Sequence, residues 1–266
     1  MTRKSRKISQ KTPQEIEKMK IGGKILVQAL EKMKQACQPG ISTKKVAKIG
    51  EDFVYSRGGK CAFLGYGGFP GVACISVNEE VVHTPPSKKI LQMGDKVSID
   101  FGVLWEGFNT DACISFFVGG NKKISAEKIK FLQTIKSAMQ AGINAARAGK
   151  KVIEISIAIE KEMKTNKKMS IVKDLAGHGI GKEVHEAPRI PNFEKKGMGE
   201  DIMLPGMTFA IEPIGIVGKS GEIITVDDGF TIASKSGEIG GHFEKTIAIT
   251  DEEPEIITEW DFFETI

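Results

Sequence analysis

The order of secondary-structure signals occurs twice along this chain, and that repetition limits the folds open to it. Helical patterns are predicted at Pro13–Gln38, Ser42–Tyr55, Ser125–Ala148 and Val152–Met163, with Thr12 as N-cap of the first. Each pair of helices precedes short β-rich runs, predicted at Gly71–Val77, Lys96–Leu104, Ala112–Val118, Met207–Val217, Phe230–Ala233 and Thr246–Thr250. The pattern therefore favours an α+β protein with a duplicated unit of two helices and a sheet.

The two halves also share the spacing between a glycine and an acid. Leu91-x-x-Gly94-x-x-Val97-x-Ile99-Asp100 lines up with Leu204-x-Gly206-x-x-Phe209-x-Ile211-Glu212, so each acid ends an alternating strand. An approximate two-fold axis between the halves would bring Asp100 and Glu212 to a common central cleft. We expect residues 1–11 to form a basic N-terminal arm and residues 12–266 a single domain, with repeats at about 12–120 and 121–250.

Composition and cysteine use point to a cytoplasmic globular protein. Hydrophobic residues make up 40% and charged residues 27% of the 266 positions, which is ordinary for a soluble domain. The four cysteines form no CxxC pair, which fits reduced thiols better than a disulfide framework. The longest uncharged window, Cys61–Asn78, is interrupted by glycine and proline and predicts strands and turns instead of a membrane helix.

Part of the net charge of +4 lies near the N-terminus, in Arg3, Lys4, Arg6, Lys7 and Lys11. A basic arm of this kind is suited to contact with the ribosome or another polyanion. The alternative is a solvated, frayed tail. We expect no membrane or DNA partner, and we expect a monomer.

Four carboxylates lie in or beside apolar strand-like runs. Asp100 follows Val97 and Ile99, and Asp111 precedes a run of apolar residues. Glu212 and Glu244 have comparable surroundings in the second half. Because a buried, unpaired carboxylate is costly, such acids usually have a cation or hydrogen-bond donors nearby.

Histidine is rare in this chain, with only four residues. His178 lies in Gly-His-Gly-Ile-Gly, where the glycines allow the backbone to approach a site closely. We therefore predict His178 as a ligand, and we expect His242 to be an ordinary core or surface side chain. Four carboxylates and one imidazole are too oxygen-rich for one zinc ion, but they suit two divalent cations that share bridging acids. Co, Mn, Fe(II), Zn and Ni all fit such ligands.

Several motifs together resemble those of type I methionine aminopeptidases, the short bacterial form within peptidase family M24. They run in order from Thr12 over nearly the whole chain: Val-Val-His83, Ile-Asp100-Phe-Gly, Asp111, Gly-His178-Gly-Ile-Gly, His185-Glu-x-Pro, Thr-Phe-Ala-Ile-Glu212-Pro and Phe-Glu244-Lys-Thr. The resemblance implies the "pita-bread" fold, with two α-β repeats around a central antiparallel sheet. It also implies removal of the N-terminal methionine from newly made proteins, with a preference for a small second residue.

The resemblance assigns roles to the matching positions. Asp100 would bind one metal ion, Asp111 and Glu244 would bridge two, and His178 and Glu212 would complete the second. A water activated by the two ions would attack the first peptide bond, and Glu212 would move its proton. His185 would stabilise the oxygen of the tetrahedral intermediate, and His83 would contact the scissile amide. The methionine pocket would be lined by Phe63, Tyr66, Phe69, Cys74 and Phe230.

Some positions depart from the family pattern. Thr84-Pro85-Pro86 follows His83 where Gly-Ile-Pro is usual, Phe63 replaces a frequent cysteine, and Lys245 replaces a usual histidine. None of these changes removes a ligand. They bear on the choice of substrate more than on activity.

Two other functions compete with this interpretation. An Xaa-Pro aminopeptidase or prolidase shares the Asp-Phe-Gly and His-Glu-x-Pro motifs, but those enzymes usually carry an extra N-terminal domain that this sequence lacks. A non-catalytic ribosome- or RNA-binding relative would typically have lost ligands. All five ligands are present here, which favours catalysis.

Overall fold

The computed structural model describes residues 8–260 of the chain. In this part the helices are α1 (Pro13–Ala36), α2 (Thr43–Ser56), α3 (Ala126–Ala145) and α4 (Ile153–Met163), with a short 3-10 turn η1 (Tyr66–Gly68). The predicted N-cap of α1 is confirmed, because the Thr12 side chain accepts from the Glu15 amide and the Glu15 carboxylate accepts from the Thr12 amide. The helix ends at Ala36, two residues before the predicted end, as the approach of Pro39 disfavours helical backbone.

A nine-stranded antiparallel sheet forms the centre of the molecule. Its strands run in the order β1-β4-β5-β14-β9-β7-β8, with β2 beside β4 and β15 beside β14. Their bounds are β1 (Lys60–Cys61), β2 (Cys74–Val77), β4 (Lys96–Trp105), β5 (Phe108–Phe117), β7 (Ala176–Gly179), β8 (Glu186–Pro191), β9 (Thr208–Ile211), β14 (Glu244–Ala248) and β15 (Glu255–Ile256).

Two three-stranded sheets flank the central one. One contains β6 (Met169–Ile171), β10 (Ile214–Val217) and β13 (Gly240–His242), and the other contains β3 (Glu80–Val82), β11 (Ile223–Thr225) and β12 (Ile232–Ser234). Strands β10, β13 and β3 adjoin one another, so the two small sheets meet beside the central sheet.

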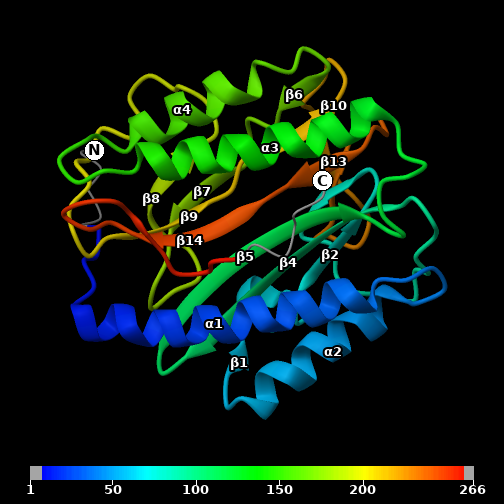
Figure 1. The fold of residues 1–266 in the computed structure, drawn as a ribbon, viewed down its shortest axis with the longest axis horizontal. Helices are drawn as coiled ribbons and strands as arrows, with labels where there is room; N and C mark the ends of the chain where they lie inside the picture. Colours follow the sequence, from blue (N-terminus) through cyan, green and yellow to red (C-terminus); the bar gives the residue numbers. More distant parts are fainter. Residues whose placement is uncertain (1–7, 261–266) are drawn as a thin grey trace.

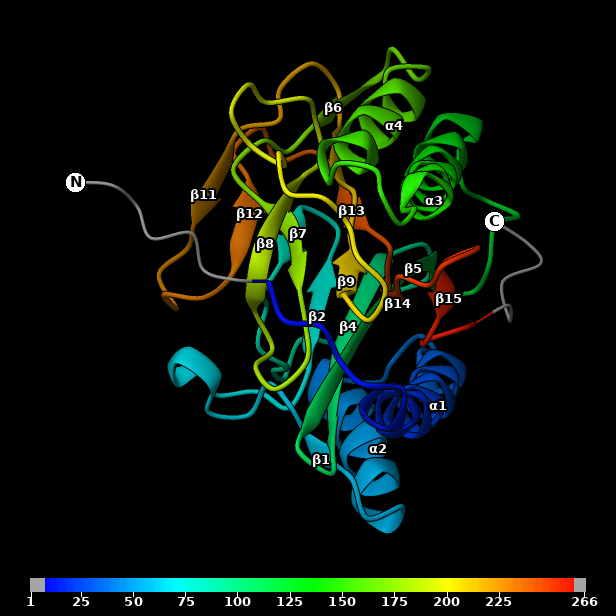
Figure 2. The same ribbon diagram turned by 90° about the vertical axis from the view of Figure 1, so that its left-hand side faces the viewer.

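The helices cover one face of the central sheet, while β11 and β12 lie on the other side (Figure 2). The pair α1 and α2 lies along one half of the sheet, and the pair α3 and α4 lies along the other half (Figure 1). Buried side chains of α1, among them Leu26, Leu30 and Met33, belong to the same apolar core as Phe101 of β4 and Phe209 of β9. The α+β class is as predicted, and the division into two sequence repeats stays a prediction.

The strands differ from their prediction in ways that matter for the site. Asp100 lies within β4 and Asp111 within β5, so neither ends a strand. The predicted run Met207–Val217 is divided into β9 and β10 by Glu212-Pro213, since proline has no amide hydrogen for the ladder. Strands β7 and β8 were not predicted, although β7 carries His178.

Two further expectations concern membranes and thiols. Across residues 8–260, no helix combines the length and the apolar character that a membrane span requires. All four cysteines are free and buried, as expected for reduced thiols. Of the basic arm, residues 1–7 lie outside the described part of the chain. Lys11 is buried, and its ammonium lies 2.8 Å from the Glu186 carboxylate.

Candidate metal centre and substrate cavity

The candidate ligands come from five neighbouring strands of the central sheet, one from each. In the order β4, β5, β14, β9 and β7, the strands carry or directly precede Asp100, Asp111, Glu244, Glu212 and His178. Successive side chains of a strand point to opposite faces, so every second residue of a strand reaches a given face. One such residue from each of five neighbouring strands places five side chains over the same face. The sheet therefore brings together residues that are up to 144 positions apart in the sequence, from Asp100 to Glu244.

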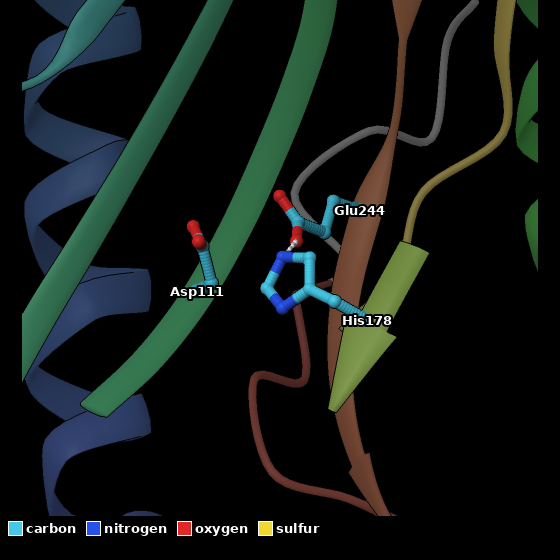
Figure 3. A group of neighbouring side chains, drawn as sticks. All are labelled: Asp111, His178 and Glu244. Atoms are coloured by element: carbon cyan, nitrogen blue, oxygen red, sulfur yellow. Dashed lines mark ion pairs between the residues drawn. The ribbon is translucent and has the colours of Figure 1, made fainter. Parts of the chain in front are cut away.

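Three of these side chains form a tight group. Ligand atoms of Asp111, His178 and Glu244 all lie within 4.8 Å of one another, and the three side chains converge from β5, β7 and β14 (Figure 3). The fourth, Glu212, has Oε1 3.5 Å from His178 Nε2, which is also 4.0 Å from Glu244 Oε1. Asp100 lines the same cavity. The pKa of Asp111 is raised mainly by burial, next by the charge of Glu244, and then by the charge of Asp100.

Two glycines allow His178 to reach this position. A Cβ at Gly177 would lie 2.5 Å from the carbonyl oxygen of Ala210, and one at Gly179 would lie 2.0 Å from that of Ala187. Any side chain at either residue would collide with the backbone of a neighbouring strand. The glycines that mark His178 in the sequence are thus required by close strand packing.

The electrostatics of the group disfavour the metal-free ionised state. Burial, followed by the charges of neighbouring carboxylates, raises the pKa of Asp111, Glu212 and Glu244 well above their ordinary values. Burial, followed by the nearby His185, lowers the pKa of His178 to about 3. The imidazole is therefore neutral at pH 7. Its Nδ1 lies 2.9 Å from the carbonyl oxygen of Gly179 and donates to it, which leaves the Nε2 lone pair toward the acids.

Several carboxylate oxygens of this group have no hydrogen-bond donor in the described part of the chain. Within residues 8–260, Asp100 Oδ1, Asp111 Oδ1 and Glu244 Oε1 are buried without a hydrogen-bond donor. Buried polar atoms without partners are rare in folded proteins, and several carboxylate oxygens of this kind in one place are typical of a cation-binding site. Carboxylate oxygens with one neutral imidazole are suitable ligands for divalent cations, so the residues present fit a metal site.

All residues predicted for metal and substrate line one cavity of about 330 Å³. They are Phe63, Tyr66, Phe69, Cys74, His83, Asp100, Asp111, His178, His185, Glu212, Phe230 and Glu244. The cavity also includes Val184, Thr225 and Ile232, which the sequence analysis did not name. Ile232 could have been predicted from the sequence, because it follows Phe230 by two residues and side chains at that spacing point to the same side of an extended chain.

One end of the cavity is apolar. Phe63, Phe69, Cys74 and Val184 form a buried cluster, against which Phe230 packs. The rings of Phe69 and Phe230 meet edge to face with centroids 5.6 Å apart. This end offers a pocket for an apolar side chain next to the acidic group.

Two further histidines, His83 and His185, line the cavity near the acidic group. The His185 ring lies 4.3 Å from the ring of His178, and its Nδ1 is 3.0 Å from the hydroxyl of Tyr66. His83 follows β3 with φ of 58°, a left-handed conformation that is uncommon for a residue with a side chain. Burial lowers the pKa of both His83 and His185, so both are neutral at pH 7.

Lys245, one of the departures from the family pattern, does not line the cavity. Its ammonium is 2.5 Å from the Glu259 carboxylate and lies over the ring of Trp260, which donates to the carbonyl oxygen of Glu244. Phe63, in contrast, lies in the apolar cluster, so its change from the usual cysteine does alter the wall.

Comparison with known proteins agrees with this geometry. The profile of metallopeptidase family M24 matches residues 17–251. A methionine aminopeptidase of Clostridium perfringens is 40% identical over 93% of this chain and 97% of its own length. The crystal structure of a methionine aminopeptidase from Thermotoga maritima superimposes with a TM-score of 0.90 at 34% identity, covering 95% of this chain and all of that one. A prolidase from Pyrococcus horikoshii shares the fold, with a TM-score of 0.73 at 21% identity, and this chain covers 64% of its length.

Proposed function

We propose that this chain, which belongs to metallopeptidase family M24, is a metal-dependent aminopeptidase that removes the N-terminal methionine from newly made proteins. The observation that carries the proposal is the convergence of five candidate ligands from five adjacent strands at one end of a cavity whose other end is apolar. The "pita-bread" fold expected from the sequence is shared by the Thermotoga maritima enzyme and the Pyrococcus horikoshii prolidase.

Two divalent cations would occupy the acidic end. Asp111 and Glu244 would be shared between them, Asp100 would bind one, and His178 with Glu212 would bind the other. Two dications match the four negative charges of the acids, and the unpartnered oxygens of Asp100, Asp111 and Glu244 support this arrangement. Cations bound there lower the pKa of a water molecule and polarise the carbonyl of the first peptide bond.

The remaining steps belong to the side chains of the protein. Glu212 would accept the proton of the attacking water and return it to the leaving amine. His185 would donate from Nε2 to the oxygen of the tetrahedral intermediate. The Tyr66 hydroxyl supports this role, since it can donate to Nδ1 and so keep the proton on Nε2. His83 would contact the nitrogen of the scissile amide.

The cavity also accounts for the choice of substrate. The apolar cluster of Phe63, Phe69, Cys74 and Val184 would hold an unbranched methionine side chain. The free α-amine would lie beside Asp100, so that only the first residue of a peptide is removed. The preference for a small second residue stays a prediction.

The alternatives have weaker support. Prolidases share the fold at a sequence identity that speaks for the fold alone. A binding protein without activity would not need five candidate ligands, three of which have a buried oxygen without a donor within residues 8–260. The cytoplasm is the proposed location, where nascent chains are available. The metal identity, the monomeric state and contact of the basic arm with the ribosome stay predictions.

A comparison of peptide substrates tests the assignment. Purified protein reconstituted with Mn²⁺, Fe(II) or Co²⁺ is incubated with Met-Gly-Met and, separately, with Gly-Pro and Ala-Pro peptides. We expect methionine to be released from Met-Gly-Met and the proline-linked residues to stay uncleaved. Cleavage before proline without release of methionine would assign the chain to the prolidase branch.

A further inference from the structure

His242 is buried beside the candidate metal centre, next to Asp100. Only 1% of the residue is exposed. Its Nε2 lies 3.9 Å from Asp100 Oδ2, and its Nδ1 has no hydrogen-bond partner among residues 8–260. The expectation from the sequence was an ordinary core or surface side chain. Its burial fits that expectation, but a core histidine would normally have its ring nitrogens satisfied.

The backbone of His242 is held in place by a buried chain of hydrogen bonds. Ser115 Oγ lies 2.6 Å from the carbonyl oxygen of His242 and donates its only hydroxyl hydrogen to it. Ser98 Oγ, 2.7 Å from Ser115 Oγ, must therefore donate to Ser115.

The chain begins at Lys96, which is fully buried in β4. Its ammonium donates to Ser98 Oγ and to the carbonyl oxygens of Ser76 and Glu80, so all three of its hydrogens are used. The direction of every bond from Lys96 to His242 is thereby fixed. Strand β13 is consequently anchored to β4 and β5 at the residue that faces Asp100.

The two ends of the His242–Asp100 contact have complementary needs. Asp100 Oδ1 is buried without a donor, while Asp100 Oδ2 is the oxygen closer to His242. Nδ1 of His242 has no acceptor, so the ring proton is better placed on Nε2, where Asp100 can accept it. The separation of 3.9 Å is too long for a hydrogen bond, and a shift of about 1 Å would close it.

We infer that His242 is a positioning residue for Asp100: it donates from Nε2 to one carboxylate oxygen and leaves the other for the cation. The inference rests on the proposed function, because it assumes that Asp100 binds a metal ion. Ligating carboxylates are commonly oriented by such an outer hydrogen bond, and loss of that bond typically weakens metal binding by about 10- to 100-fold. His242 itself does not bind the cation.

Nitrogen-15 NMR of the unmutated protein tests this directly, and the presence of only four histidines makes assignment practical. Zn²⁺ is titrated into protein labelled at the histidine ring nitrogens. We expect His178 Nε2 to take the shift of a metal ligand, while His242 Nε2 keeps its proton and that proton moves downfield. A ligand-type shift at His242 Nε2, or no response of His242 while His178 binds, would overturn the inference. Absence of a Zn²⁺ response at His178 would overturn the proposed function as well.

Affinity measurements on two variants separate positioning from mere packing. Mn²⁺ binding is measured by calorimetry for wild type, His242→Leu and His242→Gln, with thermal melting of the metal-free proteins as a check of folding. Leucine fills the space without a donor, and we expect binding to weaken by about 10- to 100-fold. Glutamine retains an N–H donor and should stay within about threefold of wild type. Equal affinity of the leucine variant, or equal loss in both variants, would overturn the inference.

Discussion

The acidic end and the apolar end of the cavity are built in different ways. Each candidate ligand comes from a different one of five adjacent strands, whose ladders fix the backbone. Of the apolar cluster, Cys74 lies in β2, whereas Phe63, Phe69 and Val184 lie outside helices and strands. His83 and His185 also lie between strands. The central sheet therefore fixes the positions of the candidate metal ligands, whereas changes in loops and turns can alter the contacts with the substrate without moving those ligands.

Replacement of Glu212 should have the largest effect, because this residue serves both the metal and the proton. We expect Glu212→Gln to lower kcat for Met-Gly-Met by about 10³-fold, within the range for loss of a general base. The control is Glu222→Gln, a change at an exposed ion pair with Lys235. Steady-state kinetics at saturating metal decide the matter, and a rate of Glu212→Gln close to that of the control would contradict the assigned role.

A change at the rim should slow the reaction and spare the metal. His185→Ala removes the proposed donor to the tetrahedral intermediate, and we expect kcat to fall by about 10²-fold. Metal stoichiometry, measured on the same preparation, should equal that of wild type. If the variant lost bound metal, the distinction between sheet-borne ligands and loop-borne contacts would fail.

The apolar end should control the binding of substrate. Phe69→Ala opens the cluster next to Phe230, and we expect kcat/KM for methionine peptides to fall by about tenfold, mainly through KM. Peptides that begin with leucine or phenylalanine should lose less, since the wider pocket admits them. A fall in kcat with unchanged KM would show that this end does more than bind.

The last prediction concerns stability without metal and does not involve activity. The pKa of Glu244 is raised above its ordinary value of 4.5, mainly by burial, so its ionisation destabilises the folded state increasingly as pH rises above 4.5. The neutral glutamine of Glu244→Gln does not ionise, so the variant avoids this destabilisation. In EDTA the variant should therefore be more stable than wild type, by a margin that grows between pH 5 and 7 at up to about 1.4 kcal/mol per pH unit. Urea unfolding at pH 5, 6 and 7 measures the margin, and a margin that shrinks with pH would refute the electrostatic account.

The sequence predicted the acidic end better than the elements that carry it. Carboxylates such as Asp100 and Asp111 are conspicuous in apolar strands, and the glycines around His178 mark a close approach of backbone. Strand β7 itself was missed, because Gly177 and Gly179 lower strand propensity and only the clash with neighbouring carbonyl groups explains them. Strand β8 was missed since Pro188 and Pro191 argue against a strand.

Particular side-chain contacts between distant residues could not be predicted from the sequence, although the meeting of Asp100 and Glu212 in one cavity was. The hydrogen bond of Tyr66 to His185 joins segments 119 positions apart, and no local pattern encodes it. Lys96 is only the first residue of a predicted strand in the sequence, yet in the structure it is fully buried and its ammonium donates to three oxygens. Such contacts depend on the register of strands that meet only in the folded chain.

Metal stoichiometry measured together with activity tests the central claim most directly. Metal-free protein is titrated with Mn²⁺, and both the bound equivalents and the release of methionine from Met-Gly-Met are followed. The strand-built site predicts two bound equivalents per chain, with hydrolysis that appears as they bind and stops when a chelator removes them. A protein that binds no Mn²⁺, or that hydrolyses the peptide equally well in the presence of chelator, would contradict the account.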